Sequence, residues 1–319
     1  HDILYGAFDG ELYFQGSAGA GSDENIELYK VTTAGTIQLV ADIEPLATSV
    51  FDELDSSPEL FTPYNGDLYF RATTAAAGTE LFRVDQNDTV SLVAEINAPH
   101  GISSLEAHAL GGGMLIWGTA DRTGAELWQV SSTGTMTALP ESEPGFASAY
   151  GQSFAVASGS AVYFGTFTAA EGNELVRIDA GGAMTSLTID PGGGDGFAHA
   201  LAEYGGLVHV AADLGDGAGI ELVRINGDVT FTRLSDLSAG AADSDIDQLA
   251  AAGGRLFFTG TDGTNTLFQM NSVGTITPVT LPVGVTGVRI WQALDDALIF
   301  SAVTSAGREL FKVGADGIT

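Results

Sequence analysis

The stretch "GDLYFRATTAAAGTELFRVD", residues 66–85, contains two apolar segments separated by a turn that includes glycine. Aromatic and β-branched residues alternate with polar ones in both segments, and this period of two residues is typical of β-strands. Close relatives of the two halves occur elsewhere, as "GELYFQG" from Gly10 and "GAELWQV" from Gly124. The stretch therefore predicts a β-hairpin that is repeated along the chain.

The Glu-Leu-aromatic motif, or a near variant, marks seven repeats with a mean spacing of 47 residues. Its first positions are Glu27, Glu80, Glu126, Glu174, Glu221, Thr266 and Glu309. An apolar strand opened by a turn precedes each motif and further strand-like segments follow it, which gives four short strands per repeat. A four-stranded repeat of this length is typical of a propeller blade.

We therefore predict an all-β, seven-bladed β-propeller with four-stranded antiparallel blades. It would form a single domain over residues 1–319, with blades of about 47 residues. Residues 10–21, "GELYFQGSAGAG", also resemble a protease-cleavable linker. Their Leu12, Tyr13 and Phe14 align with Leu68, Tyr69 and Phe70, so we assign the segment to the first blade.

The repeat resembles the ELWxxDGT, or hyalin-like, repeats of large bacterial extracellular proteins. The similarity lies in "GTELFRVD" from Gly78, in "GAELWQV" from Gly124, and in the "ADI" and "AEI" that follow the motif. The resemblance implies a secreted or cell-surface protein, with other domains in a larger chain. The chain begins "HDILYG", without Met, and we expect a mature product or a domain of a longer protein.

Charge and composition exclude several classes of function. The chain has 41 acidic and 11 basic residues, for a formal charge of -30, and this field opposes binding to nucleic acid. No apolar run reaches the roughly 18 residues that would span a bilayer, so membrane insertion is not expected. The absence of cysteine excludes disulfides, thiolate metal sites and cysteine nucleophiles.

A column of polar residues on the first strand of each blade is the candidate ligand-binding site. Residues seven positions before the turn residue that opens the second strand fall in this column. Its polar members are Glu59, Glu106, Ser153, His199, Asp247 and Arg289. Such a ring could bind a ligand where rigid strands converge. Alternatively, its members could pair with one another and line a hydrated channel.

A catalytic use of the same column requires three roles. In a polysaccharide lyase or hydrolase, His199 would be the base, Glu106 the acid and Arg289 the group that binds the carboxylate of an acidic sugar. Nucleophile elbows, HExxH and phosphate-binding loops are absent from the sequence. His209 lies in a column held mainly by Tyr and Phe, and we expect it to be a packing residue.

Calcium is the cofactor candidate for an acidic extracellular chain, because Ca²⁺ prefers carboxylate and carbonyl oxygens. The candidate ligands are Asp213, Asp216 and Asp262, in glycine-rich loops that lack a spaced Asp-x-Asp-x-Asp-Gly pattern. The same loops are also explained by turn formation alone.

The favoured function is a secreted or cell-surface, non-catalytic binding or adhesion module that recognises carbohydrate or a protein partner. Under this hypothesis the chain has no catalytic residue and needs no cofactor. The alternatives are the polysaccharide lyase or hydrolase and a calcium-stabilised structural domain.

Overall fold

The computed structural model describes most of the chain. The described residues are 5–17, 26–44, 55–94, 102–110, 113–120, 124–131, 133, 135–139, 155–168, 172–294, 296–314 and 317–319. The chain divides into two compact units, His1–Ala149 and Tyr150–Thr319. Within the described residues there are 28 strands in seven four-stranded sheets, and no helix.

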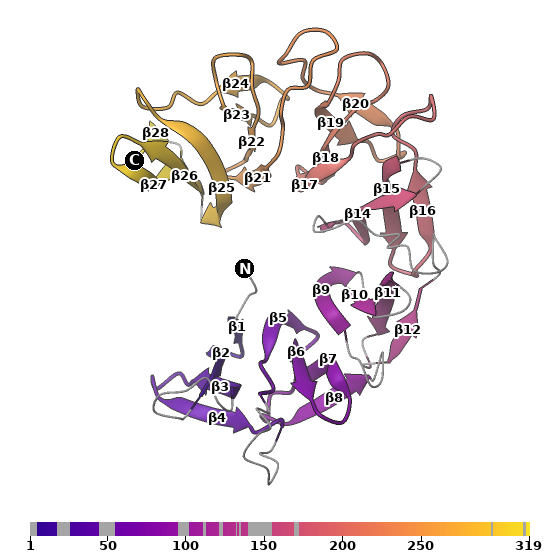
Figure 1. Cartoon of the computed structure of the whole chain (residues 1–319), viewed down its shortest axis with the longest axis vertical. Coiled ribbons are helices and arrows are strands. Elements are labelled where there is room, and N and C mark those ends of the chain that lie inside the picture. Colours follow the sequence, from indigo (N-terminus) through magenta and orange to yellow (C-terminus); the bar gives the residue numbers. More distant parts are fainter. Residues whose placement is uncertain are drawn as a thin grey trace. The chain divides into compact units, whose positions relative to one another are not determined.

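The first unit holds three blades, each built in chain order from four antiparallel strands (Figure 1). The first blade consists of β1 (Tyr5–Phe8), β2 (Glu11–Gly16), β3 (Glu27–Val31) and β4 (Ile37–Ala41). The second consists of β5 (Glu59–Tyr64), β6 (Asp67–Thr74), β7 (Gly78–Val84) and β8 (Val90–Ala94). The third consists of β9 (Ile102–Leu110), β10 (Gly113–Ala120), β11 (Gly124–Ser131) and β12 (Met136–Ala138).

The second unit holds four blades with the same strand order. The fourth consists of β13 (Ala155–Ser158), β14 (Ala161–Thr168), β15 (Gly172–Asp179) and β16 (Met184–Leu187). The fifth consists of β17 (His199–Tyr204), β18 (Leu207–Ala212), β19 (Glu221–Ile225) and β20 (Phe231–Arg233). The sixth consists of β21 (Leu249–Ala252), β22 (Arg255–Thr259), β23 (Leu267–Met270) and β24 (Ile276–Pro278). The seventh consists of β25 (Thr286–Leu294), β26 (Ala297–Thr304), β27 (Gly307–Gly314) and β28 (Gly317–Ile318).

These seven antiparallel blades confirm the predicted fold class, an all-β seven-bladed propeller. Within each unit the first strands of successive blades contact one another, as β1 contacts β5 and β17 contacts β21. The first strand is therefore the inner strand, as predicted. Residues 11–16 of the segment that resembles a linker form β2 of the first blade, as predicted, whereas residues 18–21 lie outside the described residues.

Tight turns join the first and second strands because their residues tolerate positive φ. Asp9 and Gly10 have φ of 50° and 76°, and Asn65 and Gly66 have φ of 50° and 86°. Positive φ at both central residues is characteristic of the type I′ turn, whose twist matches that of an antiparallel hairpin. The Asp-Gly and Asn-Gly pairs thus fix the start of the second strand in these two blades.

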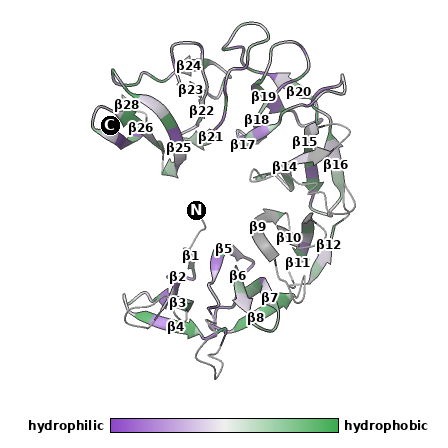
Figure 2. Ribbon diagram, in the orientation of Figure 1, coloured by the Kyte–Doolittle hydropathy of each residue, from purple (hydrophilic) through white to green (hydrophobic). Residues whose placement is uncertain are grey.

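The hydrophobic core lies between successive sheets within each unit. Phe61 and Phe70 of the second blade share a cluster with Leu28 of the first, and Leu222 of the fifth blade packs with Phe258 of the sixth. Burying each such side chain stabilises the fold by about 1.5–3 kcal/mol. Hydrophobic residues recur along the strands, and β8 is drawn mostly in green (Figure 2). No helix long and apolar enough to cross a membrane is found in the described part of the chain.

Candidate functional site

Register places four of the predicted column residues at one level of their blades. Glu59, Glu106, His199 and Arg289 each lie opposite the fifth residue of their second strand. The side chain of Glu106 and the whole of Ser153 lie outside the described residues. Glu59 is described, and its carboxylate forms an ion pair with Arg71 on the adjacent strand β6. Both side chains are largely buried.

His199 contacts backbone rather than a carboxylate. Its Nε2 lies 2.6 Å from the carbonyl oxygen of Ile246, and its Nδ1 lies 2.7 Å from that of Phe197. Ile246 precedes the first strand of the next blade, so the imidazole joins the fifth blade to the sixth. These contacts do not include the carboxylate partner that the catalytic hypothesis requires.

The prediction that Asp247 occupies the same level of the first strand is wrong. Strand β21 begins at Leu249, and Asp247 is exposed before it. Gln248 takes the level instead, because its carbonyl oxygen accepts from Thr259 N at 3.0 Å. Its side-chain Oε1 accepts from Ile290 N at 2.8 Å, which joins the sixth blade to the seventh. Arg289, beside Ile290, is exposed.

The candidate calcium ligands support turns. The Asp213 carboxylate accepts from Gly215 N at 2.8 Å and that of Asp216 accepts from Ala218 N at 3.2 Å. The Asp262 carboxylate accepts from Asn265 N at 2.7 Å, and these backbone hydrogen bonds contribute to a lowered pKa of Asp262. Among the described residues, no group of three or more His, Asp and Glu side chains is placed to hold a metal ion.

In the first blade the repeat glutamate, Glu27, is a structural residue that joins this blade to the next. Glu27 is 1% exposed, and its carboxylate accepts from Ser56 Oγ at 2.6 Å and from Ile43 N at 2.8 Å. Ser56 lies in the connection to the second blade, and its backbone N–H donates to Ile26 O at 3.0 Å. Asp55, next to Ser56, accepts from Ile26 N at 2.7 Å. We call this set of contacts the blade clasp.

The same clasp joins the fifth and sixth blades. Glu221 is fully buried and accepts hydrogen bonds from Ser235, from Ser244 and from the backbone of Leu237. Asp243, next to Ser244, accepts from the backbone N–H of the residue before Glu221 at 2.9 Å. A buried carboxylate needs such partners, because an unsatisfied polar group in the interior costs about 1–3 kcal/mol.

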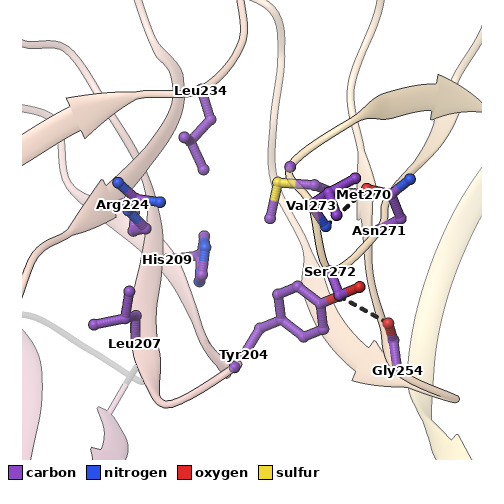
Figure 3. A pocket seen from close by; sticks show the side chains of 12 residues that line it. Tyr204, Leu207, His209, Arg224, Leu234, Gly254, Met270, Asn271, Ser272 and Val273 are labelled. Carbon is purple, nitrogen blue, oxygen red and sulfur yellow. Dashed lines mark hydrogen bonds between the residues drawn. The ribbon is translucent and has the colours of Figure 1, made fainter.

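Among the described residues, one cavity lies between the fifth and sixth blades and has a volume of about 550 Å³. We call it the 5/6 cleft. One wall carries His209 and Leu207 of β18 and Arg224 of β19, the other carries Met270 and the turn after β23, and Tyr204 lies between them (Figure 3). Its size is within the range of small-molecule sites, about 300–1,000 Å³.

His209 is the buried polar group of the 5/6 cleft. It is 2% exposed, and its Nδ1 has no hydrogen-bond partner among the described residues. Burial, with a smaller contribution from the nearby Arg224 cation, lowers the pKa of His209 to about 4. The imidazole is therefore neutral at pH 7. Its ring lies 5.8 Å from that of Tyr204, whose hydroxyl donates to Gly254 O at 2.7 Å.

Arg224 is the cation of the 5/6 cleft. It lies directly opposite His209 in the register of β18 and β19. Its Nε donates to Asn226 Oδ1 at 3.0 Å, which orients the guanidinium. Arg224 takes part in none of the ion pairs found among the described residues. The cleft thus combines a fixed cation, a buried imidazole and apolar walls.

The 5/6 cleft was not predicted as a site, although His209 was correctly expected to be buried. Residues equivalent to His209 are aromatic in four other blades, at Tyr13, Tyr69, Tyr163 and Phe257. A smaller imidazole within an aromatic column leaves space. The substitution of His for Tyr or Phe in the fifth blade was therefore the signal in the sequence that could have located the cleft.

No protein-family model and no curated protein sequence matches this chain. Solved peptidase structures match it through their propeller domains. One is a prolyl endopeptidase, with a TM-score of 0.60, 12% identity, and coverage of 100% of this chain and 49% of that one. Another is dipeptidyl peptidase 4 of Porphyromonas gingivalis, with a TM-score of 0.60, 9% identity, and coverage of 98% and 50%.

A puromycin hydrolase also matches, with a TM-score of 0.54, 13% identity, and coverage of 100% of this chain and 53% of that one. The chain thus spans about half the length of these peptidases. At such low identity the similarity shows the fold alone. It agrees with the propeller class that the seven blades establish.

Proposed function

We propose that this propeller is a non-catalytic binding module of a secreted or cell-surface protein, and that its ligand occupies the 5/6 cleft. The observation that carries the proposal is the cleft itself, in which Arg224 and the buried His209 face the apolar side chains of the sixth blade. A few polar groups set among apolar walls is the usual composition of a ligand site. The resemblance to hyalin-like repeats supports the extracellular location.

The ligand classes that suit such a module are a carbohydrate and an exposed group of a protein partner. The predicted polar column supports catalysis poorly, because Glu59 is held by Arg71 and His199 by two backbone carbonyls. We therefore favour binding over a polysaccharide lyase or hydrolase reaction.

A binding screen tests the proposal. The wild-type chain and a His209→Tyr variant, which refills the cleft with the aromatic residue of the other blades, are exposed to a glycan array and a library of short peptides. Arg177→Gln, at the repeat position of Arg224 but outside the cleft lining, is the matched control. Ligands retained by the control and lost by His209→Tyr are expected. A screen without ligands, or with ligands that bind both variants equally, contradicts the proposal.

A further inference from the structure

We propose that the 5/6 cleft selects a ligand that carries a carboxylate on a compact apolar body, with Arg224 holding the carboxylate. This inference rests on the proposed function, because it names the ligand class of the same cleft. It follows from a comparison with the equivalent space between the first and second blades, which the chain closes with its own side chains.

The closed groove between the first and second blades is organised around Lys30. Lys30 stands three residues after the repeat glutamate, as Arg224 does in the fifth blade. Its Nζ lies 2.7 Å from a carboxylate oxygen of Asp88 and 2.6 Å from one of Glu11. Tyr13 fills the remaining space and donates to Asp88 at 2.9 Å.

The 5/6 cleft has a cation, Arg224, at the position of Lys30, but no carboxylate at the positions of Glu11 and Asp88. Leu207 stands at the position of Glu11, because each is the first residue of its second strand. His209 stands at the position of Tyr13. Gly274 stands at the position of Asp88, eight residues after the repeat position, and it lines the cleft.

The turns that hold Asp88 and Gly274 have the same geometry. Asp88 N donates to Asp85 O at 3.0 Å, and Gly274 N donates to Asn271 O at 2.9 Å. The side chain of Asp85 caps its turn by accepting from Thr89 N at 2.9 Å, and Asn271 caps the other turn in the same way. Both positions have positive φ, 59° at Asp88 and 83° at Gly274. Asp88 and Gly274 are therefore equivalent in backbone conformation.

Charge complementarity identifies the missing group as an anion. The chain carries 41 acidic and 11 basic residues, and Lys30 is surrounded by two carboxylates. Arg224, in the cleft, lacks both of their counterparts. A carboxylate is the planar acceptor that a guanidinium binds through two parallel hydrogen bonds. A ligand carboxylate in the cleft would replace the carboxylate that Asp88 supplies in the closed groove.

The walls identify the body of the ligand as apolar. Leu207, Leu234, Met270 and Val273 line the cleft, and Val273 is 82% exposed at its rim. A sugar would place hydroxyl groups against these side chains, where unpaired polar groups are costly. An aryl or branched aliphatic carboxylate would bury its apolar body against these side chains. One hydrogen bond between the ligand and His209 would then remain to be made.

Calorimetric titration with 2-naphthoate and its neutral analogue naphthalene-2-carboxamide tests the charge requirement. We expect 2-naphthoate to bind the wild-type chain about tenfold more tightly, since a charge-assisted pair is worth at least about 1.4 kcal/mol. In Arg224→Gln the difference should vanish, whereas in the control Arg177→Gln it should remain. Equal binding of the two compounds to the wild type overturns the inference.

Gly274→Asp is a second, independent test, because it rebuilds the carboxylate of the closed groove. Asp88 already shows that an Asp residue is accepted at this turn position with positive φ. We expect Gly274→Asp to keep its melting temperature, to pair with Arg224 and to weaken 2-naphthoate binding at least tenfold. Unchanged binding in a folded Gly274→Asp variant contradicts the inference.

Glucuronate and glucose distinguish an acidic sugar from an apolar acid. Glucuronate that binds more tightly than 2-naphthoate overturns the apolar part of the inference. If 2-naphthoate fails while the glycan or peptide screen yields a ligand that His209→Tyr loses, the carboxylate inference is wrong and the proposed function stands. If 2-naphthoate does not bind and the glycan and peptide screen yields no ligand, both the carboxylate inference and the proposed function are contradicted.

Discussion

The closed groove and the 5/6 cleft occupy equivalent places in the repeat and differ at a few side chains. In the closed groove, Lys30 is neutralised by Glu11 and Asp88 and covered by Tyr13. In the cleft, Arg224 supplies the charge, but Leu207 and Gly274 supply no carboxylate, and the imidazole of His209 is smaller than the phenol ring of Tyr13. Two equivalent places in a repeated scaffold can thus be closed or open according to a few side chains, with no change of backbone topology.

The largest effect is expected from breaking what the two regions share, the blade clasp. Glu221→Ala would leave Ser235, Ser244 and the Leu237 N–H without their buried acceptor, and we expect a loss of about 4 kcal/mol in the free energy of unfolding. Thr266→Ala is the matched control, because Thr266 occupies the repeat position but is exposed. Urea denaturation of both variants measures the difference, and similar midpoints would refute the clasp.

The pH dependence of stability should separate the cleft from the closed groove. The pKa of His209 is about 4 in the folded chain, below its ordinary value of 6.5, because burial opposes the charge. As the pH falls below 6.5 the unfolded chain takes up this proton first, so stability declines until about pH 4. Arg224, which faces His209, lowers its pKa further, and Tyr204 lies beside it as a neutral phenol.

His209→Phe should remove about 3 kcal/mol of that decline, at about 1.4 kcal/mol per pKa unit. The measurement is the difference between wild-type and variant unfolding free energies from pH 7 to pH 4. Taking the difference cancels the titration of carboxylates common to both. A difference that does not change with pH would show that His209 is protonated equally in the folded and unfolded chains.

Opening the closed groove should cost less. Burial by itself would lower the pKa of Lys30, but the hydrogen bonds to Asp88 and Glu11 outweigh it and keep that pKa raised. Asp88→Asn removes one carboxylate and weakens the acceptor of Tyr13, for an expected loss of about 2 kcal/mol. A double-mutant cycle with Lys30→Met should show coupling, since the two residues are in contact. Additive effects would mean that the ion pair does not close the groove.

The smallest effect is expected from chelation. Asp213, Asp216 and Asp262 already accept backbone hydrogen bonds in their own turns. We therefore expect EGTA to shift the melting temperature by less than about 1 °C, because only an ion bound to the folded state stabilises it. A larger fall that calcium reverses would support the calcium-stabilised domain instead.

The fold could be predicted from sequence because its signals are local. The Asn65-Gly66 turn, the alternation along residues 67–74 and the recurring Glu-Leu-aromatic motif each report on adjacent residues. Register was harder to predict. A bulge between Glu59 and Thr62 changes which residue faces the second strand, whereas β21 begins too late to include Asp247. Such shifts depend on hydrogen bonds that the sequence does not state.

The candidate site could be predicted less well, because the partners of its members lie on other strands, in the same blade or in the next one. The polar column predicted Glu59 and His199 as ligand residues. In the structure, Glu59 pairs with Arg71 and His199 contacts the Ile246 carbonyl. The 5/6 cleft depends on the groups at three repeat positions, Leu207 and His209 on one strand and Gly274 65 residues after His209. Each substitution is unremarkable alone, and only their meeting between two blades creates the space.

The blade clasp bears on how the chain assembles during synthesis. Glu221 leaves the ribosome 23 residues before Ser244, the residue of the next repeat that completes its burial. Until Ser244 arrives, the carboxylate of Glu221 would lack one hydrogen-bond partner and would still be open to water. Folding is therefore expected to advance by overlapping neighbours, each blade being locked by the start of its successor. A polypeptide cut at a blade boundary would lose that lock, so artificial repeats made from this chain should be divided within a blade.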